Sequence, residues 1–238
     1  MEPYLLPVVF AAVFAAFTLS ASAGFGGSLI LVPTLALLLG TKSGVAMAAL
    51  LLAMNNLVKV FAYRRTLPYR KAAVIIALIA VGTFVGARLL VSAPERAVTV
   101  AVIVGFAAAF LLESPALTRF RRAGAPVMAL AAGATSGFSG TSGPLKGLAF
   151  RGLELDRFHL VGALSLASLV GDVTKTAVWT DAALLGGSDY VVAVVCLPVM
   201  FGATFLGRRF NSSIGERGYT GLFWTVMLGY TGRLVAGL

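Results

Sequence analysis

Two glycine-rich interruptions of apolar segments constrain the fold of this chain more than any other feature. The first is AGFGGSLILVP at residues 23–33, and the second is SGFSGTSGP at residues 136–144, about half a chain later. In lipid every backbone polar group needs a partner, so a broken helix persists only inside protein or beside a water-filled cavity. Matched interruptions in the two halves of a membrane protein are typical of a transport site.

The composition predicts an integral membrane protein. Of the 238 residues, 59% are hydrophobic and only 12% are charged, whereas soluble domains average about 25% charged residues. Several apolar runs reach the roughly 20 residues that a helix needs to cross the hydrocarbon layer. The short alternating segments of a membrane β-barrel are absent from the sequence. We therefore expect an all-α, multi-pass protein of the cell (inner or plasma) membrane.

The basic character of the chain is explained by its loops. The net charge is +10, but most Lys and Arg residues lie in short loops between apolar runs, where the positive-inside rule places them. The bilayer is thus the expected partner, and nucleic acid is not. Cys196 is the only cysteine and cannot form an internal disulfide. The N-terminus lacks the basic region of a signal peptide, so we expect the first apolar run to be retained.

The apolar runs repeat in the same order. The predicted helices cover 5–20, 29–39, 43–63, 72–91 and 97–112, and then 125–136, 144–150, 158–179, 190–207 and 219–235. A shift of about 116 residues places Asn56 on Asp172 and Lys59 on Lys175, as expected for an old internal repeat. We predict one membrane-embedded body of two repeats, 1–123 and 124–238. Each repeat would contain a broken, re-entrant helical hairpin and three transmembrane helices.

Loop charges predict that the two repeats are inverted. Residues 64–71 carry four Lys or Arg residues and should be cytoplasmic, whereas the equivalent loop at 180–189 carries none and should be external. Equivalent loops on opposite sides require repeats of opposite orientation. Both termini would then lie outside.

The glycine-rich runs resemble those of a known family. The chain resembles the TauE/SafE family of sulfite and organosulfonate exporters over nearly its whole length. The resemblance is carried by residues 24–33 (GFGGSLILVP), by a weaker copy of this run at 137–145, and by the apolar helix with scattered polar residues that follows each run. The resemblance implies export of small sulfur-containing anions. The chain departs from the pattern at Ser28, where a third glycine is usual, and in the second break, which has no counterpart of Pro33.

The breaks themselves are predicted to bind the anion. The free N–H groups at the start of a helix and its dipole attract anions, and glycine allows close approach of the backbone. Hydroxyl groups in the second break add side-chain donors. The candidate donors are Gly26, Gly27 and Ser28 in the first break and Ser139, Thr141, Ser142 and Gly143 in the second. The alternative is that the glycines serve only close helix packing.

Three lysines in apolar helices are further candidates. Lys59 and Lys175 each precede an aromatic helix end, and Lys146 follows the second break. A lysine at mid-membrane costs roughly 2.5–3.5 kcal/mol, so it should face a cavity or a partner. The alternatives are that Lys59 and Lys175 snorkel toward the interface and that Lys146 is interfacial.

Polar residues at corresponding depths complete the predicted site. The amides of Asn55 and Asn56 can donate to an anion. Asp172 lies three residues before Lys175, so the two share a helix face and are expected to neutralise each other. The other interpretation makes Asp172 a proton site that couples transport to the proton gradient.

The leading hypothesis is a secondary transporter that exports a small anion by alternating access. A passive anion channel with the same donors is an alternative. An intramembrane enzyme is disfavoured, because the single histidine offers neither a metal-ligand cluster nor a base for a serine nucleophile. We therefore expect no cofactor and no metal. A homodimer is one option for the oligomeric state, which the sequence leaves open.

Overall fold

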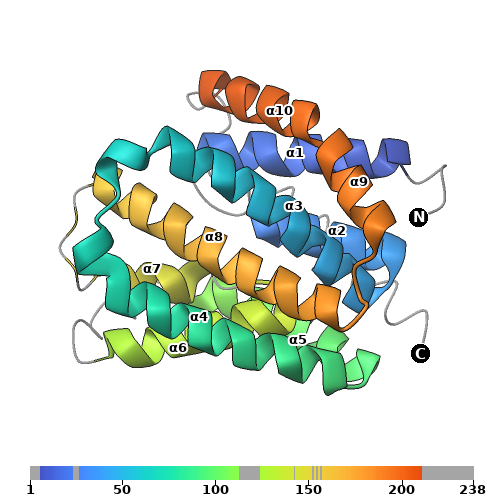
Figure 1. The fold of residues 1–238 in the computed structure, drawn as a ribbon, viewed down its shortest axis with the longest axis horizontal. Helices are drawn as coiled ribbons and strands as arrows, with labels where there is room; N and C mark the ends of the chain where they lie inside the picture. Colours follow the sequence, from blue (N-terminus) through green and yellow to red (C-terminus); the bar gives the residue numbers. More distant parts are fainter. Residues whose placement is uncertain are drawn as a thin grey trace.

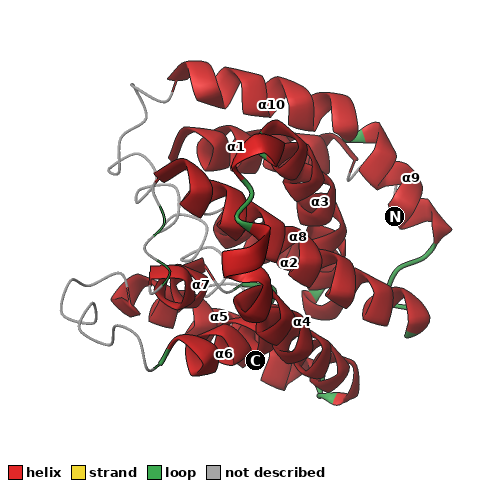
Figure 2. Ribbon diagram, turned by 60° about the vertical axis from the view of Figure 1, so that its left-hand side comes forward, coloured by secondary structure: helices red, strands yellow, loops and turns green. Residues whose placement is uncertain are grey.

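The computed structural model describes residues 6–23, 27–112, 124–141, 143–151, 153, 155 and 157–210, and every regular element within them is a helix (Figure 2). This confirms the all-α prediction for that part of the chain. The predicted helix at 219–235 lies outside the described residues. The helices are α1 (Leu6–Ala23), α2 (Gly27–Leu39), α3 (Thr41–Ala62), η2 (Arg64–Thr66), α4 (Tyr69–Ser92), α5 (Glu95–Leu112), α6 (Ala125–Ser139), α7 (Gly143–Arg151), α8 (Arg157–Asp181), α9 (Gly187–Val195) and α10 (Leu197–Phe210).

Several helices have the length and apolar character of membrane spans. Within the described residues these are Thr41–Phe61, Tyr69–Ser92 and Gly187–Leu206, with shorter apolar helices at Pro7–Thr18 and Gly27–Leu39. Their outer faces carry large apolar side chains: Val74 is 66% exposed and Phe205 is 75% exposed. Exposed apolar surface of this extent marks a face that contacts lipid or another protein.

The first half of the chain forms a tightly held hairpin. Helices α1 and α2 are separate elements on either side of residues 24–26, and α2 is joined to α3 by Gly40 alone. Gly40 has a φ of +86°, which only glycine adopts without strain. A Cβ atom on Gly44 would lie 2.3 Å from the backbone nitrogen of Ala36, so α2 and α3 touch backbone to backbone. Glu95 Oε1 accepts the Thr41 N–H at 2.9 Å and satisfies one free donor at the start of α3.

The second half differs from the sequence prediction in two places. The interruption expected at 136–144 is shorter, because α6 continues through Ser139 and ends at Gly140, which has a φ of +80°. The helix expected over 190–207 is two helices, α9 and α10, which meet at Cys196. Pro198 lacks the N–H group that would continue the helical hydrogen bonds through this point.

Four glycines bring α4 and α6 into backbone contact. A Cβ atom on Gly82 or Gly86 of α4 would lie 2.3 or 2.2 Å from carbonyl oxygens of α6, and one on Gly133 or Gly137 of α6 would lie 2.2 Å from carbonyl oxygens of α4. Each pair is spaced G-x-x-x-G, the pattern that brings membrane helices into backbone contact. For Gly137 the packing interpretation of the glycines is therefore the correct one.

Helices α3 and α8 form the centre of the bundle. They pack side by side and run in opposite directions (Figure 1). On one side of them α1 packs against α10, and on the other α4 packs against α6. The main apolar core lies around α1, α2 and α3, and a smaller one lies between α4, α6, α7 and α8. The polar side chains described next lie where α3 and α8 meet.

Candidate functional site

A buried charged pair bridges the two central helices. Asn56 of α3 donates from Nδ2 to Oδ2 of Asp172 at 2.7 Å, and Lys175 Nζ lies 2.8 Å from Asp172 Oδ1. The three residues are between 1% and 7% exposed. The predicted neutralisation of Asp172 by Lys175 is confirmed. Buried charges are tolerated only when they are paired and hydrogen-bonded in this way.

Two further contacts, one with α6 and one within α8, hold the ammonium group of Lys175 in place. Its Nζ donates to Ser136 Oγ of α6 at 3.3 Å and lies 5.9 Å from the ring centre of Trp179. Trp179 is itself fixed, because its Nε1 donates to the carbonyl oxygen of Ala87 at 3.2 Å. The snorkelling alternative is therefore wrong for Lys175, which is enclosed between α8, α6 and α3. Ser136 was not among the predicted donors, although it lies in the second glycine-rich run.

Two half-buried lysines extend this pair into a charge cluster. Asp172 interacts electrostatically with Lys59 of α3 and with Lys146 of α7. Lys146 also interacts electrostatically with Lys59 and Lys175. Lys146 Nζ donates to Ser168 Oγ of α8 at 3.0 Å. We call Lys59, Lys146, Asp172 and Lys175 the charge cluster. With all four groups ionised it carries three positive charges and one negative, a net charge of +2.

Asn55 does not join Asn56 in this cluster. Successive side chains on a helix point about 100° apart, so Asn56 faces α8 while Asn55 faces α10. There Thr204 Oγ1 donates to Asn55 Oδ1 at 3.5 Å. Asn55 Nδ2 is buried and has no hydrogen-bond partner among the described residues. The structure therefore separates two side chains that the sequence grouped.

The second helix break packs against α2 and α3. A Cβ atom on Gly140, in the second break, would lie 3.1 Å from side-chain carbons of Val32 in α2 and Val45 in α3. Gly140 thus packs against the helix that follows the first break. Lys146 lies in the first turn of α7, whose amino end faces the break.

The predicted backbone donors are only partly described. Gly27 and Gly143 are the first residues of α2 and α7, Gly27 is buried and Ser28 is half-buried. Ser139 and Thr141 are buried, and the Ser139 hydroxyl donates within α6 to the carbonyl oxygen of Thr135 at 2.9 Å. Gly26 and Ser142 lie outside the described residues.

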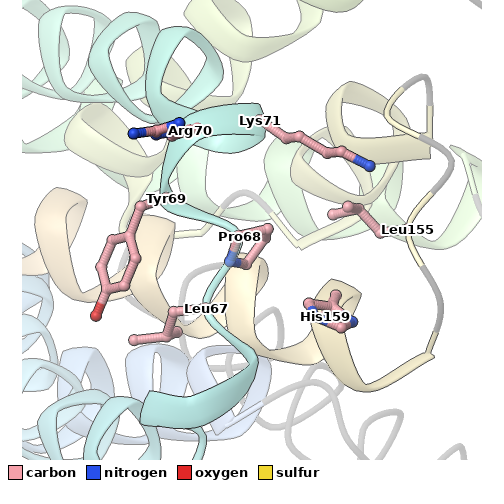
Figure 3. A pocket seen from close by; sticks show the side chains of 7 residues that line it. All are labelled: Leu67, Pro68, Tyr69, Arg70, Lys71, Leu155 and His159. Atoms are coloured by element: carbon pink, nitrogen blue, oxygen red, sulfur yellow. The ribbon is translucent and has the colours of Figure 1, made fainter.

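A basic surface hollow lies at the start of α4. It has a volume of about 420 Å³ and is lined by Leu67, Pro68, Tyr69, Arg70, Lys71, Leu155 and His159. Figure 3 shows Lys71 on the α4 side and His159 on the α8 side, with Leu155 between them. The hollow is thus next to the basic loop at 64–71. Among the described residues no three His, Cys, Asp or Glu side chains are grouped to hold a metal ion.

The fold is that of a multi-helix membrane protein with ionisable side chains buried between its helices, and such side chains mark a candidate functional site. The model of the family described as sulfite exporter TauE/SafE matches residues 9–234. The chain belongs to this family. Membership implies a membrane transporter that exports sulfite or a related sulfur-containing anion, and it agrees with the expectation that the chain is not an enzyme. Comparisons with curated proteins and with solved structures gave no match.

Proposed function

We propose that the protein exports a small sulfur-containing oxyanion by alternating access and that the anion binds at the charge cluster. The observation that carries the proposal is the group of three lysines and one acid that α3, α7 and α8 bring together, with Asp172 paired to Lys175. Positive charge inside a membrane protein is costly. A bound anion would offset it, and the lysine ammonium groups would donate to its oxygen atoms.

The second break adds donors from the backbone. Helix α7 begins at Gly143, so its first N–H groups have no partner within the helix. Lys146 belongs to the same turn and donates to Ser168 on α8. An anion at this helix start would contact both free amides and an ammonium group, a combination that favours oxyanions. We therefore place the oxyanion between the start of α7 and Lys175.

Inverted repeats are part of the proposal, and the contacts support them. Asn56 and Asp172 are separated by 116 residues, the shift that relates the two halves, and they are hydrogen-bonded to each other. Two repeat-related residues in contact must lie close to the axis that relates the repeats. The α1–α10 and α4–α6 pairs are exchanged by the same relation, and α3 and α8 run in opposite directions (Figure 1). Alternating access would follow from movement of one repeat against the other.

This geometry gives the two repeat-related lysines different roles. Lys59 and Lys175 each lie three residues beyond the Asn56–Asp172 contact, about 4.5 Å along the helix axis. Because α3 and α8 are antiparallel, the two lysines lie on opposite sides of that contact. We propose that each presents a positive charge toward one face of the membrane. The basic hollow at Arg70 and Lys71 would then attract anions at the cytoplasmic face.

Transport by purified protein in proteoliposomes tests the proposal. Sulfite, thiosulfate, methanesulfonate and acetate would be offered in turn, and saturable, counterflow-competent flux of at least one sulfur oxyanion is expected. Lys175→Met should abolish that flux. Lys42→Met is the matched control, because Lys42 donates to the Val91 carbonyl at 2.9 Å away from the cluster, and it should transport normally. Equal flux of all anions, or unsaturable currents, would instead indicate a channel.

A further inference from the structure

We propose that Asp172 couples anion binding to proton uptake. Without substrate its carboxylate acts as the internal counter-ion of Lys175. When an oxyanion binds, it replaces the carboxylate at Lys175, and the displaced carboxylate takes a proton from solvent. This inference rests on the proposed function, because it assigns a role to one residue of the same site.

The acid at position 172 is not needed to join the helices. The repeat-related position carries Asn56, a neutral residue of the same shape, and the two meet in one hydrogen bond of 2.7 Å. An asparagine at 172 could make a similar contact without any charge. Asp172 is also the one acid in the cluster, and it interacts with all three lysines. Its carboxylate therefore occupies the position that suits an external oxyanion.

The surrounding contacts suit both protonation states of Asp172. A neutral carboxyl group still accepts the Asn56 N–H through its carbonyl oxygen, so the link between α3 and α8 survives protonation. Lys175 also remains fixed, because Ser136 Oγ at 3.3 Å and the Trp179 ring at 5.9 Å do not depend on the acid. Exchange of the carboxylate for a substrate oxyanion thus requires no loss of fold.

The groups that face Asp172 all favour an anion. Helix α3 contributes Asn56 and Lys59, α7 contributes Lys146, and Lys175 lies on the same helix. Ser136 of α6 is connected to the site by its hydrogen bond with Lys175. Helix α4 contributes a neutral group, since the Thr83 hydroxyl lies 3.4 Å from a Cβ atom built on the neighbouring Gly171. Arg64 and Arg65 of η2 are exposed at the surface.

The sign of the coupling between anion binding and protonation of Asp172 follows from charge. A bound anion beside Asp172 disfavours the carboxylate and raises its affinity for a proton. By reciprocity, a protonated Asp172 raises the affinity for the anion. One coupled proton gives anion binding that weakens by up to about tenfold for each unit of rising pH.

The test uses full-length protein with Trp179 as the reporter. In a Trp224→Phe background Trp179 is the only tryptophan, and its contact with Lys175 makes its fluorescence sensitive to the site. Thiosulfate is the probe, because its charge stays fixed between about pH 5 and 8, where His and perturbed carboxyl groups titrate. We expect tighter binding at lower pH, and uptake of up to one proton per bound anion in weakly buffered solution.

Asp172→Asn separates the possible outcomes. Below about pH 7, where lysine side chains are protonated, it should bind thiosulfate with little pH dependence and take up no proton, whereas Asp172→Glu should retain both effects. Thiosulfate binding without proton uptake in the wild type would overturn the coupling role while leaving the anion site intact. Absence of thiosulfate binding at every pH would overturn the proposed site and this inference with it. If Asp172→Asn does not fold, the wild-type proton uptake and its pH profile decide alone.

Discussion

The strongest structural prediction concerns Gly137, where α6 touches α4. A Cβ atom there would lie 2.2 Å from the Thr83 carbonyl oxygen and 2.6 Å from the Ala87 nitrogen, whereas ordinary contacts begin near 3.4 Å. The helices would have to separate by about 1.2 Å at this point. The obstructing atoms are backbone, so no side chain can turn aside. Gly137→Ala should therefore cost about 2 kcal/mol, within the range for overpacked cores.

The effect is measurable as a thermal shift in detergent. For a chain of this size about 2 kcal/mol lowers the midpoint of unfolding by about 4–8 °C. Gly147→Ala in α7 and Gly202→Ala in α10 are matched controls, because a Cβ atom at either position meets nothing within 4 Å. They should be neutral or slightly stabilising, since alanine favours helices by up to about 1 kcal/mol over glycine. Midpoints that fall equally in all three variants would refute the steric reasoning.

Three further predictions address the charge cluster and the topology. Lys146→Met should raise the apparent substrate constant in proteoliposomes about tenfold, equivalent to about 1.4 kcal/mol; an unchanged constant removes Lys146 from the site. Lys175→Met should lower the unfolding free energy by about 3–5 kcal/mol by leaving Asp172 buried and unpaired. The double variant with Asp172→Asn should recover most of that loss, and additive losses would show that the two residues are not coupled. Single cysteines placed in 64–71 and 180–189, in a Cys196→Ala background, should label from opposite sides of the membrane; labelling from one side contradicts inverted repeats.

The helical order could be predicted from the sequence because apolar length alone specifies membrane helices. Helices α3, α4 and α5 fall within three residues of their expected bounds. The extent of the second break could not be predicted, because the same small residues that interrupt a helix also allow two helices to touch. Gly137 serves the second purpose, and only the position of α4 shows this. The division at Cys196 was missed because the run around Pro198 is as apolar as an unbroken span.

In the candidate site too, a contact between residues close in sequence was predictable, whereas contacts between distant residues were not. The pairing of Asp172 with Lys175 follows from a spacing of three on one helix and was predicted. Their contacts with Asn56 and Ser136 join helices far apart in the sequence and depend on packing. The repeat shift placed Asn56 and Asp172 at equivalent positions, but equivalence alone does not imply contact. Contact depends on how α3 and α8 pack, which the spacing of the residues does not specify.

The two broken hairpins are fastened to their long neighbours by different means. In the first, one glycine joins α2 to α3, and Gly44 holds their backbones together. In the second, the hydrogen bond from Lys146 to Ser168 links α7 to α8. Displacement of α2 thus requires distortion of main chain, whereas displacement of α7 can begin with the rotation of one side chain. At this contact α7 is accordingly easier to displace than α2, and the side chain that holds it is a lysine that an incoming anion would attract.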